Sequence, residues 1–287
     1  MVPIHLKFQG LWVGVALGEL YSTAHLNEQR SSDLSSPLTL SKTRALCETA
    51  ARCLNAPAGN LETWILEYER SQDLLLALLP LAFLHRAGIP GLSETLTSGL
   101  AHSDEPAKFA SALTLTQALD WFLNPSRSPQ DFIPALLKMP AFQNTATAAQ
   151  LESIQTAFTR HESFQCSPQR LSQETSPETI GPVLDAVLRT PDDFRLTLQR
   201  AAFLMPQQTE LLILVGALSG LNNGLRSLPL SWRLRLRTIQ WNGVRSLEDG
   251  LLNLADICAA QWAGCYTAPS QKWSDLAIAP PGNLCPR

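Results

Sequence analysis

Residues 8–20 read FQGLWVGVALGEL, and residues 211–224 read LLILVGALSGLNNG. Each stretch carries three glycines spaced four apart: Gly10, Gly14 and Gly18 in the first, and Gly216, Gly220 and Gly224 in the second. This spacing places the glycines along one side of a helix. Because a glycine inside a helix costs about 1 kcal/mol relative to alanine, three aligned glycines indicate close packing of backbones. We therefore expect two buried helices, and the sequence leaves open whether their glycine faces meet.

Helical periodicity also dominates the rest of the chain, where apolar residues recur at spacings of three and four. Besides 7–22 and 209–224, the segments with this pattern are 40–54, 60–87, 107–123, 147–160, 180–189, 192–205 and 247–264. Residues 232–237 alternate arginine with apolar residues, but no partner strand is evident, so a helix is favoured there too. The sequence predicts an all-α protein, a compact orthogonal bundle of about ten helices or more.

Local signals give the expected boundaries of helices and domains. Thr190 is expected to cap the helix over 192–205, with Pro191 at its first position. Residues 1–265 are expected to form one helical domain. Within it, the stretch 124–180 is rich in Pro, Ser and Gln and has the character of a loose, divergent insertion. The Pro-rich residues 266–287 are expected to form a mobile or surface-draped tail.

Composition excludes several classes of function. The chain has 287 residues, 45% of them hydrophobic, a net charge of −3 and a pI near 6.0. The chain therefore lacks the excess of basic residues that is typical of proteins that bind nucleic acid or an anionic membrane. The apolar stretches are shorter than the roughly 20 residues that span a bilayer, and the N-terminus lacks the pattern of a signal peptide. The six cysteines contain no CxxC, which predicts reduced thiols, no zinc site and a cytoplasmic protein.

Five segments in order resemble the ADP-ribosylglycohydrolase family, which includes the enzyme that reactivates dinitrogenase reductase. Residues 8–20 resemble the opening helix of that family, RGALLGLAIGDALG, and residues 190–224 resemble its second signature, which contains GGDTDT. The shorter matches are LLPLA at 78–82, LAHSDEP at 100–106 and SLPLSW at 227–232. The resemblance implies an all-α bundle of the ADP-ribosylglycohydrolase type and a hydrolase of ADP-ribosyl linkages.

The same resemblance implies a pair of magnesium ions held by acids from several helices, and this chain departs from that pattern. The first acidic cluster of the family falls on residues 40–43, where Ser41 and Lys42 replace two acids and Thr43 is kept. The second falls on residues 205–210, where Gln207 and Thr209 replace two more. Magnesium takes most of its affinity from anionic oxygen ligands, and an ammonium repels a dication. We therefore predict that the magnesium pair is lost and that no other cofactor replaces it.

Two acids remain as candidate catalytic residues: Glu19, where the family has aspartate, and Glu210, in the last position of the second cluster. With Asp73, they could form a metal-free carboxylate pair of the kind that glycosidases use. We also expect Lys42 to lie within salt-bridge reach of Glu19 or Glu210, because converging acids without a cation would repel each other. On the alternative reading, Lys42 points to solvent.

These observations favour a pseudoenzyme, a degenerate family member that binds a protein partner or an ADP-ribose-like molecule. The alternative is a weakly active hydrolase of ADP-ribosyl (glycosidic) linkages that works through Glu19 and Glu210. Four arginines between Arg226 and Arg237 form a further basic segment. They are either a solvated helix surface or a site for a phosphate or an acidic partner.

Overall fold

A computed structural model describes most of the chain. The described residues are 2–30, 40–55, 74–85, 92, 94, 96–98, 106–124, 126–142, 145–160, 180–206, 208–241 and 245–263. Residues 266–287, predicted as a tail, lie outside these ranges. No helix in the described ranges is long and apolar enough to cross a membrane.

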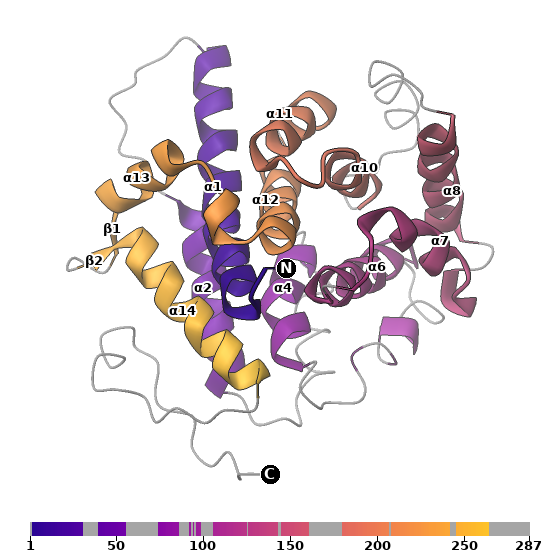
Figure 1. The fold of residues 1–287 in the computed structure, drawn as a ribbon, viewed down its shortest axis with the longest axis horizontal. Helices are drawn as coiled ribbons and strands as arrows, with labels where there is room; N and C mark the ends of the chain where they lie inside the picture. The colour runs from indigo at the N-terminus through magenta and orange to yellow at the C-terminus, as the bar shows by residue number, and fades with distance from the viewer. Residues whose placement is uncertain are drawn as a thin grey trace.

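The described part of the chain is a bundle of helices, which confirms the predicted all-α class (Figure 1). The α-helices are α1 (Ile4–Arg30), α2 (Ser41–Asn55), α4 (Leu74–His85), α6 (Pro106–Leu123), α7 (Phe132–Leu137), α8 (Ala146–Thr159), α10 (Gly181–Arg189), α11 (Phe194–Leu204), α12 (Thr209–Asn223), α13 (Leu230–Thr238) and α14 (Leu247–Trp262). The short 3-10 helices are η1 (Pro129–Asp131), η2 (Pro140–Phe142) and η4 (Leu225–Ser227). Two strands of two residues each, β1 (Gln240–Trp241) and β2 (Arg245–Ser246), form an antiparallel ladder.

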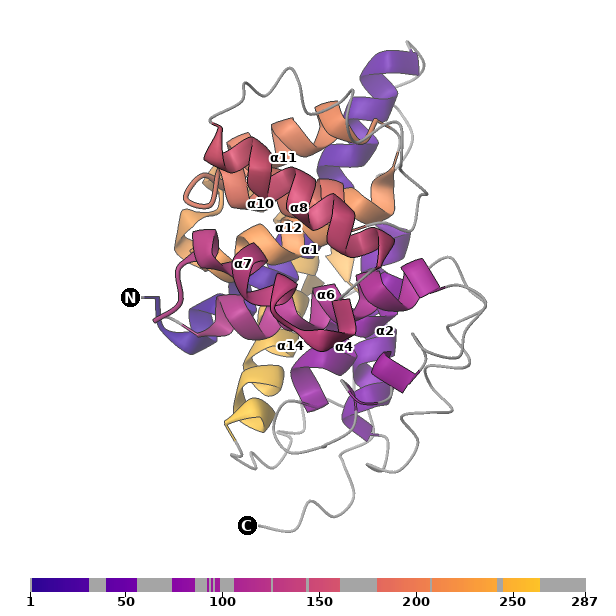
Figure 2. The same cartoon turned by 90° about the vertical axis from the view of Figure 1, so that its right-hand side faces the viewer.

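The two glycine-bearing helices, α1 and α12, are buried and lie against each other in the middle of the bundle (Figures 1 and 2). A Cβ atom added to Gly14 would overlap the carbonyl oxygen of Gly216, and one added to Gly10 would overlap that of Gly220. One added to Gly18 would lie 2.5 Å from the carbonyl oxygen of Leu212. The helices therefore run antiparallel with their backbones in contact, which confirms that both glycine faces are buried and shows that they face each other.

The other helices surround this central pair. Helices α14 and α13 pack on α1, and α10 and α11 pack on α12. Helix α6 joins α12 to α4, and α4 in turn contacts α2. Figure 2 shows α7 and α8 on the outside of this arrangement, next to α6 and α10. The interior is continuous, because apolar residues from all of these helices belong to one core.

A buried charge ties α1 to the end of α6. The ammonium of Lys7 donates a hydrogen bond to the backbone oxygen of Phe122, in the last turn of α6. A cation is favourable at this position because the carbonyl end of a helix carries partial negative charge. Lys7 is nevertheless almost fully buried, and this burial lowers the pKa of its ammonium.

Part of the 124–180 stretch is packed more closely than its composition suggested. Phe132, Phe142 and Leu151 are fully buried, and all three belong to the main core. The prediction of a loose insertion is therefore wrong for the described residues of 129–159, because Ile133, Leu136 and Ile154 are also buried, on helices that contact α6 and α10. Residues 161–179 lie outside the described ranges.

Two local predictions have different outcomes. Residues 232–237 are helical, as favoured, since they lie within α13. Thr190, however, does not cap α11: this helix begins at Phe194, and the side chain of Asp193 accepts the hydrogen bond from the backbone N–H of Leu196. Thr190 instead follows the last turn of α10, where its hydroxyl donates to the carbonyl oxygen of Ala186.

Candidate functional site

Glu19 lies on α1 directly after Gly18, and its carboxylate is almost completely buried, with 4% of the residue exposed. One carboxylate oxygen accepts a hydrogen bond of 2.9 Å from the backbone N–H of Lys42. The other accepts two hydrogen bonds from Thr43, at 2.7 Å from its backbone N–H and 2.6 Å from its hydroxyl. Both oxygens of Glu19 are therefore engaged by donors within the protein.

Two of these donors are backbone N–H groups in the first turn of α2, so Glu19 caps that helix from a different helix. The residue before α2 is Leu40, whose side chain has no acceptor, and the first turn of α2 contains no acid. The opening N–H groups of a helix have no intrahelical partner and carry partial positive charge. The buried carboxylate of Glu19 accepts hydrogen bonds from these N–H groups, and its negative charge balances their partial positive charge. Glu19 therefore has a structural role that the sequence pattern did not reveal.

Lys42 joins α2 to the start of α12. Its ammonium lies 2.9 Å from a carboxylate oxygen of Glu210, which is in the first turn of α12. The prediction that Lys42 reaches Glu19 or Glu210 is confirmed, and its ion-pair partner is Glu210. Lys42 and Glu210 keep side-chain exposures of 35% and 40%, so this pair is accessible to water. The alternative, that Lys42 extends into solvent alone, is wrong.

The described positions at which the sequence departs from the family pattern lie where α2 and α12 begin, beside α1. Ser41 is exposed at the first position of α2. Thr209 opens α12, and its hydroxyl shares a hydrogen bond of 2.8 Å with the hydroxyl of Ser22 on α1. Gln207 and Asp73, the other residues singled out by the resemblance, lie outside the described ranges. The structure therefore brings together Glu19, Ser22, Lys42, Thr43, Thr209 and Glu210.

This set of residues does not fit a magnesium pair. The two oxygens of Glu19 already accept three hydrogen bonds, and the accessible carboxylate of Glu210 is paired with an ammonium. Magnesium requires several oxygen ligands in octahedral geometry, with carboxylates supplying the charge. Across the described ranges, no group of three or more His, Cys, Asp or Glu residues is placed to hold a metal ion.

The carboxylate pair considered from the sequence also lacks support from this geometry. A general acid or nucleophile must reach the substrate with a free oxygen. Glu19 is buried, and donors occupy both of its oxygens. Glu210 is the more accessible of the two acids, and Lys42 contacts it directly.

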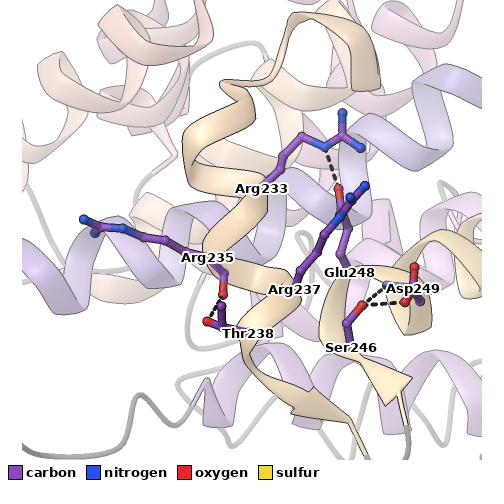
Figure 3. A network of polar contacts seen from close by, with 7 residues as sticks. All are labelled: Arg233, Arg235, Arg237, Thr238, Ser246, Glu248 and Asp249. Atoms are coloured by element: carbon purple, nitrogen blue, oxygen red, sulfur yellow. Dashed lines mark hydrogen bonds and ion pairs between the residues drawn. The ribbon is translucent and has the colours of Figure 1, made fainter.

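A second polar network lies beside this site, between α13 and α14 (Figure 3). Glu248 is fully buried in the first turn of α14, and it accepts hydrogen bonds from Arg233, at 2.6 Å, and from Arg237. The hydrogen bond to Glu248 raises the pKa of Arg237. Ser246 caps the same helix through the backbone N–H of Asp249. The interpretation of the arginines as only a solvated surface is therefore wrong for Arg233 and Arg237, because both pair with the buried Glu248, although the side chain of Arg237 stays 52% exposed.

Contacts around Trp232 connect this network to the candidate site. Trp232 of α13 packs against Tyr21 of α1, with ring centroids 5.4 Å apart, and against Phe194 of α11, at 6.3 Å. From the first turn of α2, Arg44 donates a hydrogen bond of 3.0 Å to the backbone oxygen of Gln240, two residues past α13. Helix α13 is thereby fixed beside the starts of α2 and α11.

The described cysteines offer no nucleophile. Cys47, Cys53 and Cys258 are free and buried. Burial raises the pKa of the Cys53 and Cys258 thiols to about 12, and that of Cys47 rises as well. A thiol reacts as its thiolate, so these three side chains are inert at neutral pH.

Comparison with known proteins gives one match, which covers most of the chain. A family model described as ADP-ribosylglycohydrolase matches residues 41–266. This range begins at the first residue of α2, so α1 and Glu19 precede it. Neither the curated proteins nor the solved structures contain a significant match to this sequence. The family match agrees with the all-helical fold and with the sequence resemblance, and the chain belongs to the ADP-ribosylglycohydrolase family.

Proposed function

We propose that this chain is a non-catalytic member of its family, which uses the helical scaffold to bind a partner. One observation carries the proposal: the ammonium of Lys42 lies 2.9 Å from Glu210, at the position where the resemblance implies carboxylates around magnesium. The positive charge that an acidic site needs is supplied by the chain itself. A covalently attached ammonium satisfies the acid, but it has no open coordination position and does not activate a water molecule.

The engagement of Glu19 supports the same conclusion. Its carboxylate holds the start of α2 in place, and a metal ion could use that carboxylate only in competition with the three hydrogen bonds that it accepts. Leaving the buried N–H groups of α2 without acceptors would cost on the order of 1–3 kcal/mol each. Metal binding would therefore oppose folding in this region.

A weakly active hydrolase is the second candidate, and the exposure of Glu210 is the observation that favours it. With 40% of its side chain accessible, Glu210 could reach a bound ligand if Lys42 moved away. Lys42 would then have to leave an ion pair of the exposed kind, which contributes only about 0–1 kcal/mol.

Hydrolysis and binding assays on the purified chain separate these functions. The release of ADP-ribose from an ADP-ribosylated protein is measured with and without magnesium, and magnesium and ADP-ribose are each titrated by calorimetry. We expect no magnesium-dependent release and no heat of magnesium binding at millimolar concentration. Release that requires magnesium and disappears in Glu210→Gln, with the circular dichroism spectrum unchanged, would refute the non-catalytic proposal.

A further inference from the structure

The outer face of α13 exposes two large apolar side chains one helical turn apart. Leu230 and Leu234 have exposures of 61% and 48%, although α13 is held firmly by Trp232 and by the buried Leu236 on its inner side. Ser231 and Arg235, which are also exposed, form a parallel row beside the two leucines. Single exposed leucines are ordinary on protein surfaces, whereas two in register on one helix form a ridge that another helix could cover.

The charged residues of the segment that carries this ridge all have one sign. Residues 225–241 contain four arginines and no acid, in a chain whose net charge is −3. Glu248 engages two of these arginines, Arg233 and Arg237. In the described structure Arg226 and Arg235 have no ion pair. Figure 3 shows the guanidinium of Arg235 pointing away from Glu248 and from the other labelled side chains.

We propose that the α13 ridge, made of Leu230 and Leu234 with Arg235 beside them on α13 and the exposed Arg226 on the preceding η4, docks an acidic amphipathic helix of another protein. The apolar side of such a helix would cover the leucines, and its carboxylates would pair with the two arginines. Charge argues against a second copy of this chain, since a two-fold contact between α13 ridges would bring like arginines together. The ridge adjoins the candidate site through Trp232 and Tyr21.

This proposal specifies the partner surface that the proposed binding function requires, so it rests on that function. Its test is the binding of the full chain to a fluorescein-labelled amphipathic helical peptide of leucine and glutamate, followed by fluorescence anisotropy. We expect saturable binding that weakens as sodium chloride is added, because the exposed charges are screened. A peptide with lysine in place of every glutamate should bind at least about tenfold more weakly.

Two double variants and one matched control locate the contact. Leu230→Ser with Leu234→Ser should weaken binding by about tenfold or more, since apolar anchors carry most of the affinity of a small interface. Arg226→Ala with Arg235→Ala should remove most of the salt dependence. Leu196→Ser is the control, because Leu196 is comparably exposed, at 43%, on the neighbouring α11. The residues substituted in these three variants are all exposed, and circular dichroism shows whether each variant keeps its fold.

Several outcomes would overturn the proposal. The first is an absence of peptide binding up to about 1 mM. Equal binding of the lysine peptide, or an equal loss in Leu196→Ser, would mean that the peptide binds without recognising this ridge. Binding to phosphatidylserine vesicles that depends on the leucines, without peptide binding, would assign the ridge to a membrane surface. Concentration-dependent dimers that dissociate in the leucine variant would assign it to a second copy. Assaying ADP-ribose release on the same samples separates this test from that of the proposed function, because hydrolysis by the parent refutes the non-catalytic proposal alone.

Discussion

Replacing Glu19 by glutamine tests the structural role of the buried carboxylate with the smallest possible change in shape. The carboxylate accepts three hydrogen bonds, two from the backbone of α2 and one from the hydroxyl of Thr43. An amide has one oxygen, and its NH₂ group would face a donor. The variant therefore loses at least one hydrogen bond and weakens the others.

The size of the effect follows from those contacts. A hydrogen bond to a charged acceptor contributes about 1.5–3 kcal/mol and a neutral one about 0.5–1.5 kcal/mol, while a buried donor left without a partner costs about 1–3 kcal/mol. The variant exchanges charged acceptors for neutral ones and leaves one donor unsatisfied. We therefore expect its free energy of unfolding to fall by about 3 kcal/mol or more. For a domain of this size such a loss lowers the melting temperature by about 6–12 °C.

The measurement is urea unfolding followed by far-UV circular dichroism, with two comparison variants. Thr43→Val removes only the hydroxyl contact and should cost about 1 kcal/mol. Glu48→Gln makes the same chemical change at an exposed position of α2 and should stay within about 0.5 kcal/mol of the parent. If Glu19→Gln is as stable as Glu48→Gln, the carboxylate does not cap α2 and the reasoning fails.

Three further results are expected. Lys42→Met should lower the free energy of unfolding by only about 0–1 kcal/mol, because both members of the ion pair are accessible to water. A loss above about 2 kcal/mol in urea unfolding would contradict this. Gly14→Ala should lower the free energy of unfolding by about 3 kcal/mol or more, because the new methyl group meets backbone atoms of α12. Gly250→Ala, whose methyl group would lie nearest to the ring of Trp241, should lower it less, and equal melting temperatures would disprove backbone contact between α1 and α12. Cys47, Cys53 and Cys258 should resist alkylation by iodoacetamide at pH 8, about half a unit below the ordinary thiol pKa, until the protein unfolds. Rapid labelling of any of the three, detected by peptide mapping, would contradict their burial.

The sequence by itself determined the elements of this protein and the helices at its centre. Helical periodicity gives α2, α6, α12 and α14 nearly to their observed ends, because the apolar residues that face a core repeat with the period of the helix. Helix α1 is the exception, since it continues to Arg30, well past the predicted 7–22. The spacing of the glycines identifies the two helices that allow close approach, since only the absence of a side chain permits it. The loss of acids at Ser41, Lys42 and Thr209 is likewise a property of residue types alone.

Tertiary structure decided which of these residues meet. Glu19 and Thr43 are 24 positions apart, and Glu248 lies 15 positions beyond Arg233, so no local pattern links them. Lys42 had two candidate partners in the sequence, and the approach of α2 to α12 selects Glu210, while the backbone of the same lysine contacts Glu19. Thr190 fits the composition of a helix cap, yet the turn between α10 and α11 gives that role to Asp193. Periodicity records only which side of each helix is buried; pairing between distant charges depends on how the helices cross, and that is fixed by the packing of the whole core.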